Sequence, residues 1–150
     1  MYKALDVAKF IIDKCNEKNM AIGNLKLQKV LYFVQAEFLV VKNTPCFVEE
    51  IEAWDFGPVI PEVYQEYKVY GGSIIPIFKN SNFAFISKYD QELIDGIIDE
   101  CAKYSTSVLA NIIHRQSPWR EAYYRIDDNV ISKQSIKEYF DYSISINSQK

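Results

Sequence analysis

The chain has 150 residues, 49% hydrophobic and 15% aromatic, a composition that excludes global disorder and a length that predicts one domain over residues 1–150. The formal net charge of −3 argues against nucleic acid as a partner. Apolar runs are far shorter than the about 20 residues needed to cross a bilayer, and the first residues lack a signal-peptide pattern, so we expect a cytoplasmic protein without a membrane partner.

Helical spacing of apolar residues predicts two helices at the start of the chain. The first covers residues 4–18, and the second begins at Asn24 as its N-cap and continues to about residue 42. Apolar positions of the second helix form one stripe that we expect to be buried against Leu5, Ala8, Ile11 and Ile12: Leu27, Val30, Leu31, Val34, Phe38 and Val41.

The middle of the chain has shorter elements. Alternation around Ile51 and Ala53 predicts a strand, and residues 57–61 form a rigid turn with Pro61 as the first residue of a short helix. Two β-like runs, 74–78 and 83–86, predict a hairpin with its turn at residues 79–82.

The last third is helical. Ser87, Ser105 and Ser132 are expected to begin helices, and Pro118 begins a short one, whereas residues 143–150 lack periodicity and are expected to fray. The sum is an α+β fold, a mainly helical single domain with a small β-sheet or hairpin element.

Candidate chemistry is sparse. His114 is the only imidazole, and we interpret it as a residue at a helix end that packs on Trp119 rather than a general base. The acidic group around Glu50 is interpreted as a solvated strand edge rather than a metal site. Three distant cysteines favour reduced thiols over zinc or disulfides. We therefore expect no enzyme activity, no metal and no cofactor.

An interaction surface is the alternative that the residues favour. Aromatic side chains flank a bend stiffened by Pro58 and Pro61, and rigid aromatics concentrate binding energy. Neighbouring acids would select a basic partner. The expected partner-binding residues are Glu49, Glu52, Trp54, Asp55, Phe56 and Tyr64. The competing interpretation places Trp54 and Tyr64 in the core.

Two other functions stay open at this point. The first helix pair has the order of a helix-turn-helix, with Lys26 and Lys29 near the start of the second helix, which would make the protein a DNA-binding transcriptional regulator. A small hydrolase would use His114 with a nearby carboxylate.

Three stretches resemble the SocA-like antitoxin family, also called the Panacea domain: residues 25–36, residues 50–64, and residues 109–114 with Pro118 and Trp119. Their order and separation match over nearly the whole chain, although Cys46 and Ile113 depart from the residues expected there. The positions that carry the resemblance are Leu27, Gln28, Lys29, Tyr32, Gln35, Gly57, Pro58, Val59, His114, Pro118 and Trp119.

The resemblance implies a function. Members of this family are bacterial or phage-encoded proteins of the cytoplasm that neutralise a co-encoded toxin by direct protein contact. One role within the family is that of a proteolytic adaptor that delivers the toxin to a AAA+ protease. The resemblance therefore implies a cognate protein toxin as the partner, and a AAA+ protease as a second one.

Overall fold

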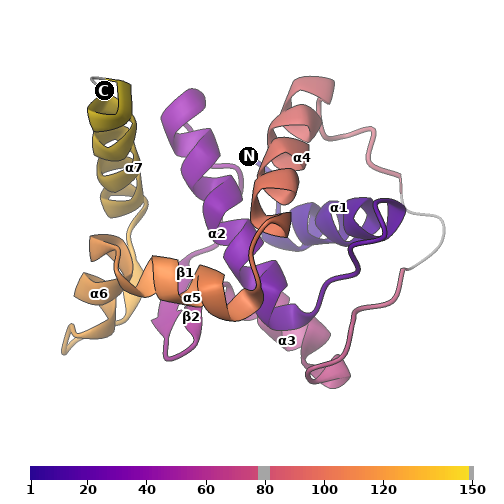
Figure 1. Ribbon diagram of the computed structural model, residues 1–150, viewed down its shortest axis with the longest axis horizontal. Coiled ribbons are helices and arrows are strands. Elements are labelled where there is room, and N and C mark those ends of the chain that lie inside the picture. The colour runs from indigo at the N-terminus through magenta and orange to yellow at the C-terminus, as the bar shows by residue number, and fades with distance from the viewer. Residues whose placement is uncertain (78–81, 149–150) are drawn as a thin grey trace.

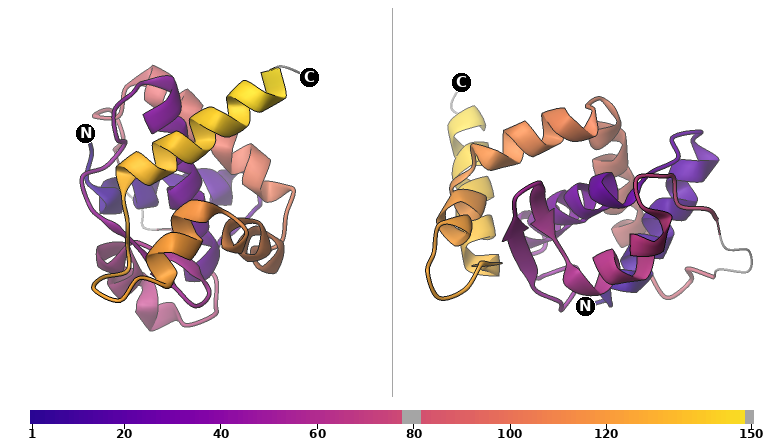
Figure 2. Two further views of the ribbon diagram at one scale, coloured as in Figure 1. Left: turned by 90° about the vertical axis from the view of Figure 1, so that its left-hand side faces the viewer. Right: turned by 90° about the horizontal axis from the view of Figure 1, so that it is seen from below.

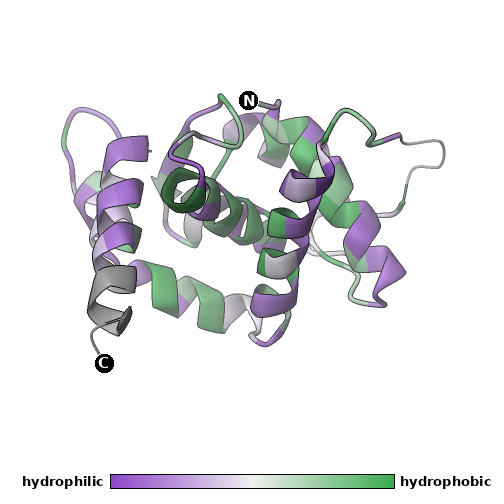
Figure 3. Ribbon diagram, turned by 90° about the horizontal axis from the view of Figure 1, so that it is seen from above, coloured by the Kyte–Doolittle hydropathy of each residue, from purple (hydrophilic) through white to green (hydrophobic). Residues whose placement is uncertain are grey.

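A long central helix organises the fold. The computed structural model describes residues 1–77 and 82–148, and from residue 143 onward its backbone alone. Helix α2 (Asn24–Val41) lies between α7 (Lys133–Ser148) and α4 (Lys88–Ala102) (Figure 1). The view from above shows the same order, with the hydrophobic α2 in the middle and the more hydrophilic α7 beside it (Figure 3). Most of α2 is buried, because the sheet and helices on several sides pack on it.

Some of the remaining helices pack on α2, and others pack on its neighbours (Figure 2). They are α1 (Ala4–Glu17), α3 (Pro61–Tyr67), the 3₁₀ turn η1 (Lys68–Tyr70), α5 (Thr106–His114) and α6 (Ser117–Tyr123). The predicted caps are confirmed, because the hydroxyls of Ser87, Ser105 and Ser132 each accept a backbone N–H three residues on. Pro61 is the first residue of α3, as predicted.

A three-stranded antiparallel sheet in the order β2-β1-β3 packs below α2. The predicted strand is β1 (Ile51–Trp54), and it pairs with β2 (Gly57–Val59) and with β3 (Val130–Ile131). The predicted turn at residues 57–61 is thus wrong in its first half. The chain turns earlier, at Asp55 and Phe56, because Pro58 fits an edge strand opposite Ala53 without needing to donate a hydrogen bond.

The predicted hairpin of residues 74–86 is also wrong in the part that the structure describes. Ile74 pairs with Gly23 in an isolated bridge, and Phe83 and Ile86 belong to a turn. Packing with the rest of the protein explains the difference. Ile75 and Ile86 are buried in the core, and the Phe83 ring lies 5.3 Å from that of Phe10 on α1. Residues 78–81, which include most of the expected turn, lie outside the described residues.

Two details at the ends of α2 differ from expectation. Its N-cap is Gly23, and Asn24 is the first helical residue, where its side chain donates to the Tyr64 carbonyl at 3.1 Å. Val41 at the other end is 47% exposed, whereas the rest of the predicted stripe is buried. The backbone of α7 continues to Ser148, and fraying of residues 143–150 stays a prediction.

Truncation in the stripe should be costly. Leu31 is 0% exposed, so Leu31→Ala should lower the free energy of unfolding by about 2–5 kcal/mol through lost burial and a residual cavity. The matched control is Val41→Ala on the same helix, which should cost well under about 1 kcal/mol. Urea denaturation measures both variants, and equal costs for the two would contradict this packing.

Candidate functional site

Buried polar side chains of α2 hold the segment that carries the expected partner surface. The Gln35 carboxamide accepts the backbone N–H of Cys46 at 2.7 Å and that of Phe47 at 3.2 Å, and it donates to the Phe47 carbonyl at 3.0 Å. Gln28 accepts the N–H of Ile60 at 2.8 Å. Both amides are 0% exposed. The two ends of residues 46–60 are therefore fixed to one helix.

A third polar contact of α2 fixes the connection between α5 and α6. The Tyr32 hydroxyl donates to the side chain of Gln116 at 2.6 Å, and both side chains are buried. Burial raises the pKa of Tyr32, so the phenol stays protonated and remains a donor. The side chains that carry the family resemblance on α2 thus bind loops rather than solvent.

Lys29 is a buried cation beneath the expected surface. It is 1% exposed, its ammonium donates to the Leu25 carbonyl at 3.2 Å, and it lies 5.9 Å from the Phe56 ring centroid. Burial lowers the pKa of Lys29 to about 8. Gly57 makes this arrangement possible, because its φ is +125° and a Cβ there would lie 3.2 Å from Lys29 Cε.

Trp54, Phe56 and Tyr64 form one aromatic cluster, as the sequence predicted from the bend between them. The Trp54 ring lies 5.0 Å from Tyr64 and 5.7 Å from Phe56, in edge-to-face geometry. All three side chains are half-buried. The cluster therefore lies at the edge of the core, and part of each residue faces solvent.

A second ring stack joins α5 and α6 to this cluster. The Trp119 ring lies 4.2 Å from the tilted His114 ring and stacks on Tyr123 at 4.4 Å, and its indole N–H donates to the Trp54 carbonyl at 3.0 Å. Within the part of the chain that the structure describes, the buried His114 Nε2 has no hydrogen-bond partner. His114 packs on Trp119 as expected, and none of the described residues bonds to its Nε2 as the partner of a general base would.

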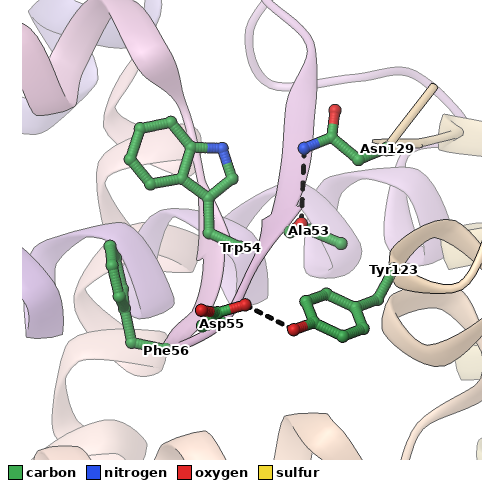
Figure 4. A pocket seen from close by; sticks show the side chains of 6 residues that line it. All are labelled: Ala53, Trp54, Asp55, Phe56, Tyr123 and Asn129. Atoms are coloured by element: carbon green, nitrogen blue, oxygen red, sulfur yellow. Dashed lines mark hydrogen bonds between the residues drawn. The ribbon is translucent and has the colours of Figure 1, made fainter.

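A pocket of about 450 Å³ opens between the two groups of rings. Trp54 and Phe56 lie on one side of it and Tyr123 on the other, with Asp55 between them (Figure 4). The Tyr123 hydroxyl donates to Asp55, and Asn129 donates to the Ala53 carbonyl at 3.4 Å. Sequence reasoning missed Tyr123 and Asn129. The spacing of Tyr123 four residues after Trp119, on one helical face, was the signal for the first of them.

The three acids of the expected surface have different environments. Glu49 accepts the N–H of Ala4 at 2.9 Å and so stabilises the N-terminus of α1, where a negative charge is favourable. Glu52 accepts the indole N–H of Trp54 at 2.9 Å. Both are half-buried, and Asp55 is exposed. The expectation that the acids are freely exposed is therefore correct for Asp55 alone.

The helix-turn-helix interpretation is wrong. A recognition helix must present its side chains to the major groove, but α2 is the central helix of the fold. Lys29 is buried, and the Lys26 ammonium donates to the Tyr104 carbonyl at 2.8 Å. The helix that would have to enter the major groove is therefore inside the protein, and its Lys29 cannot reach DNA phosphates.

Other chemistry finds little support in the described part of the chain. No group of three or more His, Cys, Asp or Glu side chains there is placed to hold a metal ion. Cys15, Cys46 and Cys101 are free and buried, as predicted, and burial raises their pKa values. Among the same residues, no helix has the length and apolar character needed to cross a membrane.

The fold and the site define a mainly helical α+β domain with a rigid aromatic and acidic surface. Residues 27–120 match the family model of the antitoxin SocA-like Panacea domain. The chain belongs to this family. It is 33% identical over 124 residues to the antitoxin SocA of Caulobacter vibrioides. The matched region covers 75% of this chain and 66% of that protein. No solved structure matches the chain.

The buried charge of Lys29 should make stability depend on pH. Its pKa is about 8 in the folded protein and about 10.4 when unfolded, so the unfolded state binds more protons between these values and stability rises with pH. At pH 7 Lys29→Met should be more stable than the parent by roughly 2–3 kcal/mol, and the difference should shrink towards pH 10.

Urea denaturation between pH 7 and pH 10 measures the Lys29 effect. Lys9→Met, which replaces an exposed lysine, is the matched control and should follow the parent at every pH. Parallel curves for the parent and Lys29→Met would contradict the burial of a charged amine at this position.

Proposed function

We propose that this protein is an antitoxin that neutralises a co-encoded protein toxin in the cytoplasm by direct binding. Membership in the SocA-like family and the 33% identity to an antitoxin carry the proposal. The structure supports it with a surface suited to protein contact, in which Trp54, Phe56 and Tyr64 are held in place before any partner arrives. Aromatic side chains of this kind contribute most to interface energy.

Expression of the neighbouring gene tests the proposed function. The product of the adjacent open reading frame is expressed alone and together with this chain. It should arrest growth when alone and lose its toxicity on co-expression, and the two proteins should co-purify. Rescue without a complex would contradict neutralisation by direct binding.

The same cells distinguish two modes of neutralisation. If the antitoxin occludes the toxin, the amount of toxin stays constant during rescue. If it serves as an adaptor for a AAA+ protease, the toxin disappears, and deletion of the protease restores both the toxin and the growth arrest.

Charge reversal tests the position of the partner surface. Glu52→Lys with Asp55→Lys should weaken binding of the toxin by about 10-fold or more, since it removes charge complementarity beside the aromatic cluster. The matched control is Asp13→Lys with Glu17→Lys on α1, which changes net charge equally. Thermal denaturation checks that both variants fold, and calorimetry measures binding. Equal binding by the two would place the partner elsewhere.

We also propose that the protein performs no catalysis. His114→Gln should lower the equilibrium constant for folding or weaken toxin binding, in either case by less than about tenfold, because the imidazole packs on Trp119. It should remove no catalytic turnover. Growth rescue and a hydrolase screen on the purified protein measure the two effects. An activity that His114→Gln abolishes in a folded protein would overturn the non-enzymatic assignment.

A further inference from the structure

The pocket between the β1–β2 turn and α6 combines aromatic faces with an unpaired carboxylate. Trp54, Phe56 and Tyr123 surround Asp55 (Figure 4). Asp55 is exposed, and in the described part of the chain no Lys or Arg forms an ion pair with it. Its negative charge is therefore available to a ligand from outside the domain.

The principal donors around the pocket are already used inside the protein. The Tyr123 hydroxyl donates to Asp55, and the Trp54 indole N–H donates to Glu52. The hydrogen bond to Asp55 raises the pKa of Tyr123, so this phenol remains a neutral donor. What the pocket offers is a carboxylate oxygen and the electron-rich faces of aromatic rings, which together favour a cation.

We propose that this pocket receives an arginine side chain of the toxin. The inference rests on the proposed function and identifies the chemical group that the surface recognises. A guanidinium is planar, stacks on aromatic faces and pairs with a carboxylate, whereas the compact ammonium of lysine does not stack. The pocket of about 450 Å³ is wide open to solvent, so a long side chain can enter it from the surface.

Continuity with the aromatic cluster favours a protein side chain over a free small molecule. Trp54 and Phe56 line the pocket and also contact Tyr64, so one surface extends from the pocket across the cluster. An arginine seated beside Asp55 places the rest of the partner over Tyr64. The pocket thus selects an arginine, while most of the area of contact with the toxin lies on the aromatic cluster.

A model compound tests the pocket without the toxin. The full chain, labelled with ¹⁵N, is titrated with N-acetyl-arginine methylamide and, separately, with the uncharged isostere N-acetyl-citrulline methylamide. The arginine compound should shift the Trp54 indole N–H and the Tyr123 amide, and it should bind about 5-fold or more tightly than the citrulline compound. Equal binding of the two, or shifts confined to other parts of the chain, would overturn the inference.

Asp55→Asn is the decisive variant for that titration. The substitution removes the charge, while an amide oxygen at the same position still accepts the Tyr123 hydroxyl, so the fold is retained. It should abolish the preference for arginine over citrulline. Asp13→Asn on α1 is the matched control and should leave the preference unchanged. A preference that survives Asp55→Asn would also overturn the inference.

A double-mutant cycle then tests the toxin. Each Arg and Lys of the adjacent gene product is changed to Ala and measured against the parent and against Asp55→Asn. One arginine should couple with Asp55 by about 10-fold in Kd. If the parent neutralises the toxin but no arginine couples with Asp55, the inference fails and the proposed function stands. If the parent binds no toxin, the proposed function fails, and the inference, which names a toxin side chain, fails with it.

Discussion

Buried amide side chains of α2 fix the segment that carries the proposed partner surface. Residues 46–60 contain only two short strands, so much of their backbone needs hydrogen-bond partners from elsewhere. Gln35 supplies three of these bonds at one end, and Gln28 supplies one at the other. Each amide is fully buried, and a buried polar group without a partner would cost about 1–3 kcal/mol. The loop backbone and the buried amides of the helix therefore satisfy each other's hydrogen bonds.

Lys29, unlike the buried amides, lowers the stability of the fold. A buried ammonium with one carbonyl partner destabilises the fold at neutral pH, and the chain passes close to it at Gly57, whose φ of +125° favours glycine. Residues that oppose local stability tend to mark functional sites, where another requirement sets the choice. Lys29 lies directly beneath Phe56, so this cost is located under the aromatic cluster.

The sequence predicted those parts of the fold that have a local signal. Helical periodicity and serine caps located the long helices, and alternation located β1. Strand β3 has two residues and no period, and its position depends on the N–H of Ala53, which donates to the Asn129 carbonyl at 2.8 Å. The hairpin was predicted from a local signal that tertiary packing overrides. Ile75 and Ile86 are buried in the core of the protein and do not pair with each other in a sheet. At the site, the rings near the bend were predictable, whereas Asn129 had no local signal.

The Trp119 indole connects two of the three stretches of sequence that resemble the family. Pro118 lies in the first turn of α6, and Trp119 then binds the Trp54 carbonyl on β1, 65 residues away. One helical turn further on, Tyr123 reaches Asp55 at the tip of the hairpin. The α2 stretch holds the same hairpin from the other side, through Gln28 and Lys29. The three stretches are therefore parts of one site, and a partner bound there would contact a surface whose rings are fixed from both sides before binding.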